Sequence, residues 1–293
     1  MPREVSPFRR VAADFAGDPL AVAGLVLLAT ILAIALAAPL ISPQNPYDLA
    51  QLDIMESSLP PGARSAEGAT FWLGTDDQGR DMLSAIFYGL RISLIVGVTS
   101  TLIALALGLV LGLTAAYVGG RTETLIMRIA DIQLSFPAIL IALILLAVLG
   151  QGTLKIVAAL VTVQWAYYAR TVRAAGLVEK RKEYVEAARG LALSPARIVF
   201  GHILPNCLPP VIVVATVQVA AAIALEATLS FLGLGLPITE PSLGLLIANG
   251  YQYLLSGKYW ISFFPGVALV LVIVSINLVG DRLRDALNPR FQR

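Results

Sequence analysis

Residues Glu186 to Pro205 read EAARGLALSPARIVFGHILP, and the interpretation of the whole chain starts from this stretch. It belongs to a basic segment, residues 170–204, that separates two apolar runs. Gly190 interrupts a run of good helix formers, and Ser194 followed by Pro195 is typical of the N-cap and first residue of a new helix. The stretch therefore predicts a helix, a sharp turn and a second helix.

The composition predicts a membrane protein. Of 293 residues, 57% are hydrophobic and 14% are charged, with a mean hydropathy of +0.80. Soluble domains carry roughly 25% charged residues, and this chain cannot bury so much apolar surface in one globular core, so its solvent must be lipid. The single cysteine, Cys207, excludes an internal disulfide and a zinc site built on several thiolates. The single histidine, His202, argues against most metal and acid–base chemistry.

Apolar runs predict an all-α membrane protein with six transmembrane helices, a core of five preceded by an N-terminal span. About 20 helical residues cross the roughly 30 Å hydrocarbon layer. A cleaved signal peptide is the alternative for the first run, but the apolar region of a signal is only about 7–15 residues long. The fourth run is short, and Lys155 and Arg170 can extend it by snorkelling. The predicted spans are 20–40, 92–118, 132–149, 156–169, 205–225 and 261–280.

Two features of the sequence outside the basic segment predict local structure. Gly108 and Gly112 in the second span are spaced so that another helix backbone can approach closely. Residues 41–91 form a proline-containing loop, and from Asp81 apolar residues at helical spacing predict a short helix at the membrane surface. This helix could pack against the bundle or help to receive a substrate carrier. Residues 236–260 read as a second polar loop.

The distribution of basic residues predicts the orientation. With six spans, 16 of the 21 lysines and arginines fall on one side, in the two termini, residues 119–131 and residues 170–207. Basic residues favour the cytoplasmic side. We therefore expect residues 1–19 and 281–293 to be cytoplasmic, together with the Glu186 loop, and residues 41–91 to be extracytoplasmic.

The Glu186 loop has the features of a docking site, although a merely solvated loop fits the pattern as well. Ala187, Ala188 and Gly190 leave little bulk at the turn, so that the groove of another protein could close around it. Glu186 and Arg189 offer charges to such a partner. The residues alone leave both readings open.

Glu186-Ala187-Ala188, with Leu204-Pro205 ending the segment, resembles the EAA loop of ABC importer permeases. One position departs from that pattern, since glycine is expected six residues after the glutamate. Ala192 stands there and the glycine is at Gly190, so we expect a turn of different shape. Three more motifs, which extend the resemblance to about residues 19–290, are similar to the dipeptide/oligopeptide (DppC/OppC-like) branch: LGTDDQGRD at 73–81, LSFLGLG at 229–235 and GDRLRDALNP at 280–289.

The resemblance implies a permease transmembrane domain at 92–280, with an EAA-type loop at 176–205, in a bacterial inner membrane. The chain would pair with a second, homologous but different permease subunit, and an extracytoplasmic binding protein would deliver substrate. Two ATPase subunits would bind ATP and magnesium, and their closure would tilt spans four and five. The chain has no G-x-x-x-x-G-K-[ST] loop, so we expect no enzymatic activity or cofactor of its own, and no nucleic-acid partner. The implied ATPase-coupling residues are Glu186, Ala187, Ala188, Arg189, Gly190, Ser194 and Pro195.

Polar residues within the spans are candidates for a substrate path. A carboxylate near the centre of a helix costs about 2.5–3.5 kcal/mol on insertion scales, which draws attention to Glu226. It could line the path, or it could make an interhelical hydrogen bond or a subunit contact. Amide side chains often hold helices together in the same way. The candidates are Gln164, Gln218, Glu226 and Asn277.

Peptides are the substrate that the resemblance favours, and nickel, glutathione, opines or sugars are alternatives within the same architecture. An intramembrane enzyme would need a catalytic set in the spans, whereas the only histidine, His202, lies in the predicted cytoplasmic loop. An ATP-independent secondary transporter or channel is a more distant alternative. Such proteins often show repeated halves with broken helices, and we see no clear repeat in the sequence.

Overall fold

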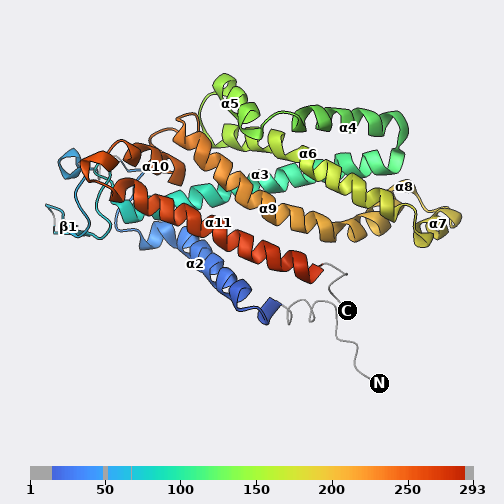
Figure 1. Ribbon diagram of the computed structural model, residues 1–293, viewed down its shortest axis with the longest axis horizontal. Coiled ribbons are helices and arrows are strands. Elements are labelled where there is room, and N and C mark those ends of the chain that lie inside the picture. The colour runs from blue at the N-terminus through green and yellow to red at the C-terminus, as the bar shows by residue number, and fades with distance from the viewer. Residues whose placement is uncertain (1–14, 49–51, 67, 288–293) are drawn as a thin grey trace.

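The computed structural model describes residues 15–48, 52–66 and 68–287. The predictions for residues 1–14 and 288–293, at the two termini, lie outside this range. The described chain is mostly helical, as predicted, and most helices run along its long axis (Figure 1). One end holds α7 (Glu183–Gly190) and α8 (Pro195–Ile198), and we call it the α7 end. The other, the α10 end, holds α10 (Leu243–Tyr251) and the two short strands β1 (Ala63–Arg64) and β2 (Thr70–Phe71).

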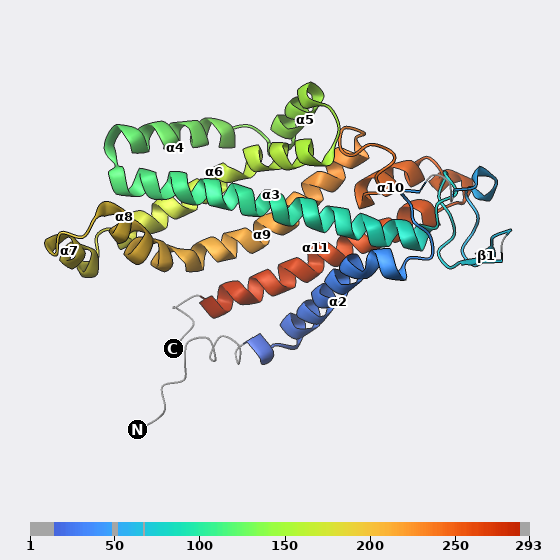
Figure 2. The ribbon, with the colours of Figure 1, turned by 180° about the vertical axis from the view of Figure 1, so that it is seen from behind.

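Helix α2 (Pro19–Ile41) corresponds to the predicted first span. The carboxylate of Asp18 caps it, accepting hydrogen bonds from the backbone N–H groups of Leu20 (2.9 Å) and Ala21 (3.4 Å). α2 packs along α11 (Trp260–Leu287), as the rear view also shows (Figure 2). A Cβ added at Gly24 would lie only 2.7 Å from Cβ of Leu278, so the glycine permits this close contact.

Helix α3 (Met82–Val118) is one continuous helix of 37 residues. The predicted span at 92–118 lies within this helix, whereas the prediction of a separate short surface helix before it is wrong. The predicted start is confirmed, because Asp81 is the N-cap and its carboxylate accepts a hydrogen bond from the backbone N–H of Ser84 at 2.8 Å. At 1.5 Å per residue the helix is about 55 Å long, which exceeds the roughly 30 Å hydrocarbon layer.

The third span is broken. Helix α4 (Gly120–Leu134) covers most of residues 119–131, between the predicted second and third spans, and the first residues of the predicted third span. Helix α5 (Ala138–Leu149) follows it at an angle of 90°. The prediction of one span at 132–149 is therefore wrong. Pro137 explains the break, because it has no backbone N–H to donate and disfavours helical geometry in the residue before it.

Helix α6 (Thr153–Glu179) extends well beyond the predicted residues 156–169 and packs along α3. The glycines of the second span make this contact, as predicted. A Cβ at Gly108 would lie 2.3 Å from Cβ of Tyr168, and one at Gly112 would lie 2.7 Å from Cβ of Val172. Since such distances are too short for real atoms, only glycine allows the two backbones to approach this closely.

The predicted N-cap at Ser194 is confirmed, and its hydroxyl accepts a hydrogen bond from the backbone N–H of Arg197. α8 then runs through a π-helical stretch, Val199–Ile203, directly into α9 (Leu204–Phe231). The predicted boundary at Pro205 is therefore wrong. The backbone N–H of Leu204 donates to the carbonyl of Val199, five residues back, so the hydrogen-bond register shifts just before the proline and the helix continues through it.

The segment between α9 and α11 is more regular than the polar loop predicted for residues 236–260. It contains α10, capped by Ser242, whose hydroxyl accepts from the backbone N–H of Leu245 at 3.2 Å. Leu243 and Leu246 are completely buried against the bundle. The following helix, α11, continues to Leu287, beyond residue 280 where the sixth span was predicted to end.

Within the described residues, four helical runs are long and apolar enough to cross a membrane: α2, α3, Pro195–Phe231 and α11. The bent pair α4 and α5 makes a fifth if it counts as one broken span. The predicted count of six is therefore not confirmed. α6 is long enough, but it carries Lys155, Arg170, Arg173 and Glu179, which lower its hydropathy.

Candidate functional site

The turn after α7 gives the Glu186 loop its shape. The backbone N–H of Leu193 donates to the carbonyl of Ala188 at 3.2 Å, and that of Ala192 donates to the carbonyl of Arg189 at 2.9 Å. This pair of bonds is a Schellman motif, which requires a left-handed residue and usually has glycine there. Ala192 takes that role with a φ of 53°. The alanine therefore keeps a glycine-type backbone, contrary to the expected change of shape.

The predicted coupling residues of α7 divide between two faces. Glu186, Ala187, Arg189 and Gly190 are exposed, whereas Ala188 is only 3% exposed. Residues three and four apart share a face of a helix, so a buried face formed around Ala188 leaves its neighbours outward. Ser194 and Pro195, after the turn, are exposed as well.

The buried face of α7 belongs to an apolar cluster that fixes the loop to the bundle. Val185, which is fully buried, and Ala188 contribute from α7. The other buried members come from α3, α6, α8 and the run into α9: Leu113, Val172, Ile198, Ile203, Cys207 and Val211. The outward face of α7 is thus held by apolar contacts to three long helices.

Glu179, at the end of α6, joins α6 to α7 by polar contacts. Its carboxylate accepts hydrogen bonds from Lys182 Nζ at 2.7 Å and from the hydroxyl of Tyr184 at 2.6 Å. Burial and the neighbouring Glu179 carboxylate raise the pKa of Tyr184 to about 12. The phenol therefore stays protonated and keeps donating at physiological pH.

Glu226 lies in the contact between α9 and α3 and has no exposed surface. Its carboxylate accepts hydrogen bonds from the hydroxyls of Ser93 (2.9 Å) and Ser230 (2.8 Å). Ser93 belongs to α3, so the acid and its partners connect two helices. This arrangement compensates part of the cost of burying a carboxylate.

The structure brings Gln164 and Gln218 together and places Asn277 elsewhere. Gln164 is buried, accepts from the hydroxyl of Thr101 at 3.3 Å and donates to the backbone carbonyl of Gln218 at 3.4 Å. It therefore links α6 to both α3 and α9. Gln218 is partly exposed, and Asn277 is exposed on α11.

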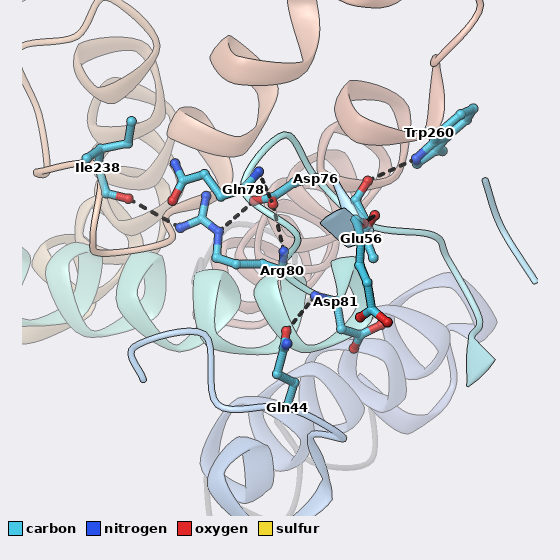
Figure 3. Close-up of polar contacts among 9 residues, drawn as sticks. Gln44, Glu56, Asp76, Gln78, Arg80, Asp81, Ile238 and Trp260 are labelled. Atoms are coloured by element: carbon cyan, nitrogen blue, oxygen red, sulfur yellow. Dashed lines mark hydrogen bonds and ion pairs between the residues drawn. The ribbon is translucent and has the colours of Figure 1, made fainter. Parts of the chain in front are cut away.

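A polar cluster at the α10 end was not assigned from the sequence, although it lies in the LGTDDQGRD motif (Figure 3). Asp76 pairs with Arg80, and Nη1 of Arg80 donates to the backbone carbonyl of Ile238 at 3.2 Å. The indole of Trp260 donates to the backbone carbonyl of Thr75 at 3.1 Å. The motif thus joins the start of α3 to the α9–α10 loop and to the start of α11. The four-residue spacing of aspartate and arginine was the only local signal.

A second set of contacts not anticipated from the sequence attaches α4 to α6. Two ion pairs connect these helices, Asp131 with Arg170 and Glu123 with Arg173. Trp165 donates from its indole to the side-chain oxygen of Gln133 at 2.7 Å.

Across the described residues, no group of histidine, cysteine, aspartate and glutamate is arranged to hold a metal ion.

Comparison with known proteins places the chain in a family. The profile described as "Binding-protein-dependent transport system inner membrane component" matches residues 108–293, and that of the "N-terminal TM domain of oligopeptide transport permease C" matches residues 6–61. The methionine ABC transporter MetNI in an inward-facing conformation shares the fold, with a TM-score of 0.57 and 22% identity over 71% of this chain and 98% of that one.

Curated relatives match over nearly the whole chain. The di/tripeptide transport system permease protein DppC of Pseudomonas aeruginosa is 37% identical over 98% of this chain and 93% of that protein. The oligopeptide transport system permease protein OppC of Bacillus subtilis is 34% identical over 99% and 92%. These matches confirm the resemblance seen in the motifs. The chain therefore belongs to the family of inner membrane components of binding-protein-dependent transport systems.

Proposed function

We propose that this chain is a permease subunit that moves di- or oligopeptides into the cell, driven by ATP hydrolysis in separate subunits. The relatives named above are permeases of peptide transport systems, which supports the substrate class. The observation that carries the proposal is the outward face of α7. Glu186, Ala187 and Arg189 are exposed there, on a short helix anchored from below by Val185 and Ala188.

The arrangement of the helices supports a cytoplasmic α7 end. The start of α2 and the end of α11 both point toward the α7 end in the two ribbon views (Figures 1 and 2). The same end holds Lys180, Arg181 and Lys182, and basic residues favour the cytoplasm. We propose that both termini are cytoplasmic and that the α10 end faces outward. This end carries the polar cluster of Asp76, Arg80 and their partners, which we call the Arg80 cluster.

In the proposed assembly the chain makes three kinds of subunit contact. A second permease subunit, homologous to this one but different from it, lies beside the chain in the membrane. Two ATPase subunits, which hold ATP and magnesium, dock at the α7 end, and a binding protein delivers substrate at the α10 end. The family description, a component of a binding-protein-dependent system, supports the binding protein and the division of labour.

The mechanism follows from how α7 is attached. An ATPase that closes on ATP displaces the outward face of α7, around Glu186. The apolar cluster beneath α7 passes this displacement to α6 and α9, because Val172 and Val211 belong to that cluster. Packed interiors transmit strain because they have little free volume. Repeated closure and opening would then alternate the side on which the substrate path is open.

The four polar residues of the spans serve two purposes in this proposal. Glu226 and Gln164, which are buried in contacts between helices, hold the helices in register. Gln218 and Asn277, which keep exposed surface, line the substrate path. Replacement of Asn277 by leucine should then change peptide uptake without lowering the thermal stability, whereas Glu226→Ala should lower the stability.

Uptake of a labelled dipeptide into proteoliposomes tests the proposal, with the permease pair, ATPases and binding protein reconstituted together. Glu186→Lys should abolish ATP-dependent uptake while the chain remains inserted. The matched control is Arg121→Glu, which reverses an exposed charge at the start of α4, outside α7, and should retain uptake. Normal ATP-coupled uptake by Glu186→Lys would contradict the coupling role. Uptake of nickel, glutathione, opines or sugars in place of peptides would overturn only the substrate class.

A further inference from the structure

Lys180 occupies the break between α6, which ends at Glu179, and α7, which begins at Glu183. Its side chain reaches across to the end of α3. Nζ donates hydrogen bonds to the backbone carbonyls of Ala116 at 3.0 Å and Tyr117 at 2.8 Å. One ammonium group therefore connects the hinge of the Glu186 loop to a helix that lies more than 60 residues earlier in the chain.

The two carbonyls that Lys180 binds lie in the last turn of α3. The last four carbonyls of a helix have no partner within it, and a cation also interacts favourably with this end of the helix dipole. The backbone N–H of Gly119 satisfies the carbonyl of Ala115. Lys180 supplies the partner for the next two, so it acts as the C-terminal cap of α3.

The ring of Tyr117 makes a second connection between α3 and α7. Lys180 Nζ lies 5.8 Å from the ring centroid, and Cζ of Arg189 lies 5.9 Å from it. Cations at this distance from an aromatic face are attracted to it. Arg189 belongs to α7, three residues after Glu186, so the proposed docking face is linked to the end of α3 through one aromatic side chain.

Close packing prevents α3 from sliding independently beneath these contacts. A Cβ added at Gly176 of α6 would lie 2.9 Å from Cβ of Ala116, one of the residues whose carbonyl Lys180 holds. The end of α3 is thus in direct contact with α6 on one side and tied to the α6–α7 hinge on another. A movement of α7 cannot be absorbed at residues 180–182 without breaking these bonds or moving α3.

We propose that Lys180 and Tyr117 are positioning residues that transmit the displacement of α7 to α3, so that α3 moves together with α6 when the ATPases close. This inference rests on the proposed coupling role of α7. The resemblance implied that the fourth and fifth spans, which correspond to α6 and α9, tilt, and this inference adds α3 to them. Because α3 is a single helix from Met82 to Val118, its far end carries the movement to the Arg80 cluster, where the binding protein is proposed to dock.

The number of peptides transported per ATP hydrolysed, in the reconstituted complex, tests this inference. Lys180→Met and Tyr117→Leu should each lower the ratio by about 5-fold or more, the lower range of coupling between distant sites. ATPase subunits should still co-purify with both variants. Lys180→Arg, which keeps the charge, and Tyr117→Phe, which keeps the ring, should recover most of the ratio. Arg181→Met is the matched control, since it removes an exposed charge from the adjacent position and should leave the ratio unchanged.

A distance measurement, made with Lys180 intact, tests the inference independently of these variants. Spin labels at Val118 and Leu191, both exposed, report the separation of the end of α3 from the α7 turn. The separation should stay the same with and without trapped ATP. A change in that distance, an unaltered transport ratio in Lys180→Met, or loss of the ATPases from it would overturn the inference. Failure of the wild-type complex to couple uptake to ATP would instead reject the proposed function.

Discussion

Asp76 and Arg80 form an ion pair with 2.6 Å between Oδ2 and Nε, and their side chains are 0% and 1% exposed. The other oxygen of Asp76 accepts hydrogen bonds from the backbone N–H groups of Gln78 and Arg80, both at 2.9 Å. Because Arg80 also donates to the backbone carbonyl of Ile238, this pair joins the start of α3 to the loop between α9 and α10 at the α10 end.

Removing one partner of this pair should be strongly destabilising. Arg80→Met leaves the Asp76 carboxylate buried without its cation, which typically costs about 3–5 kcal/mol. Thermal unfolding of the purified protein in detergent should show a large fall in midpoint. Arg64→Met, at an exposed position of β1, is the control and should change little. Equal midpoints for the two variants would show that the buried pair does not stabilise the fold.

Asp77 should make stability depend on pH. Burial, followed by repulsion from Asp76, raises the pKa of Asp77, and Arg80 opposes the shift only in part. The folded state therefore binds the proton more tightly than the unfolded state does. The stabilisation is fully present below the ordinary pKa of aspartate and is lost as the pH rises through the raised value. Asp77→Asn should thus reduce the loss of thermal stability over this interval, and an unchanged pH profile would contradict the assignment. Burial also raises the pKa of Asp81, so this residue should account for the dependence of stability on pH that remains in Asp77→Asn.

The contact between α3 and α6 should tolerate no side chain at Gly108. A Cβ there would lie 2.3 Å from Cβ of Tyr168 and 2.9 Å from the backbone nitrogen of Ala169, so the helices would have to separate. We expect Gly108→Ala to cost about 1–3 kcal/mol, as overpacking usually does. Gly266→Ala on α11, where a Cβ meets nothing within 4 Å, should be neutral or stabilising. Thermal unfolding of the two variants measures the difference. Similar midpoints would show that α3 and α6 do not pack closely at Gly108.

The turn after α7 should become more stable with glycine at position 192. An L-residue in the left-handed region costs roughly 1–2 kcal/mol, and Ala192→Gly removes this strain. Hydrogen exchange at the amide of Leu193, which donates to the carbonyl of Ala188, should slow in this variant. Gly190→Ala places an alanine in the last turn of α7, where a Cβ meets nothing, and should slow it further. Faster exchange in Ala192→Gly would show that the left-handed conformation is not strained.

Local chemistry made parts of this structure predictable. The cap at Ser194 and the start of α3 at Asp81 follow from side chains that bond to backbone groups three residues away. The first span was clear because α2 has no charged residue over its whole length. The contact at Gly108 could be inferred because small residues at helical spacing have few other uses in an apolar helix.

Contacts between distant segments could not be predicted in the same way. Arg80 binds a carbonyl 158 residues away, and Glu226 accepts from a serine 133 residues away. Neither partner has a local signature. The break at Pro137 was not predicted, because a proline near the start of a helix is usually tolerated, whereas here it separates two helices that meet at 90°.

Photo-cross-linking from α7 tests the docking face most directly. Ala187→Cys places a thiol on the exposed face, Ala188→Cys places one on the buried face, and the native Cys207 is buried. Each variant is labelled with benzophenone maleimide, assembled with its ATPase subunits and illuminated. We predict cross-links to an ATPase subunit from position 187 and far fewer from position 188. The absence of a cross-link from position 187 would contradict docking of the ATPase on α7 if the unlabelled Ala187→Cys thiol also reacted with maleimide equally fast before and after assembly.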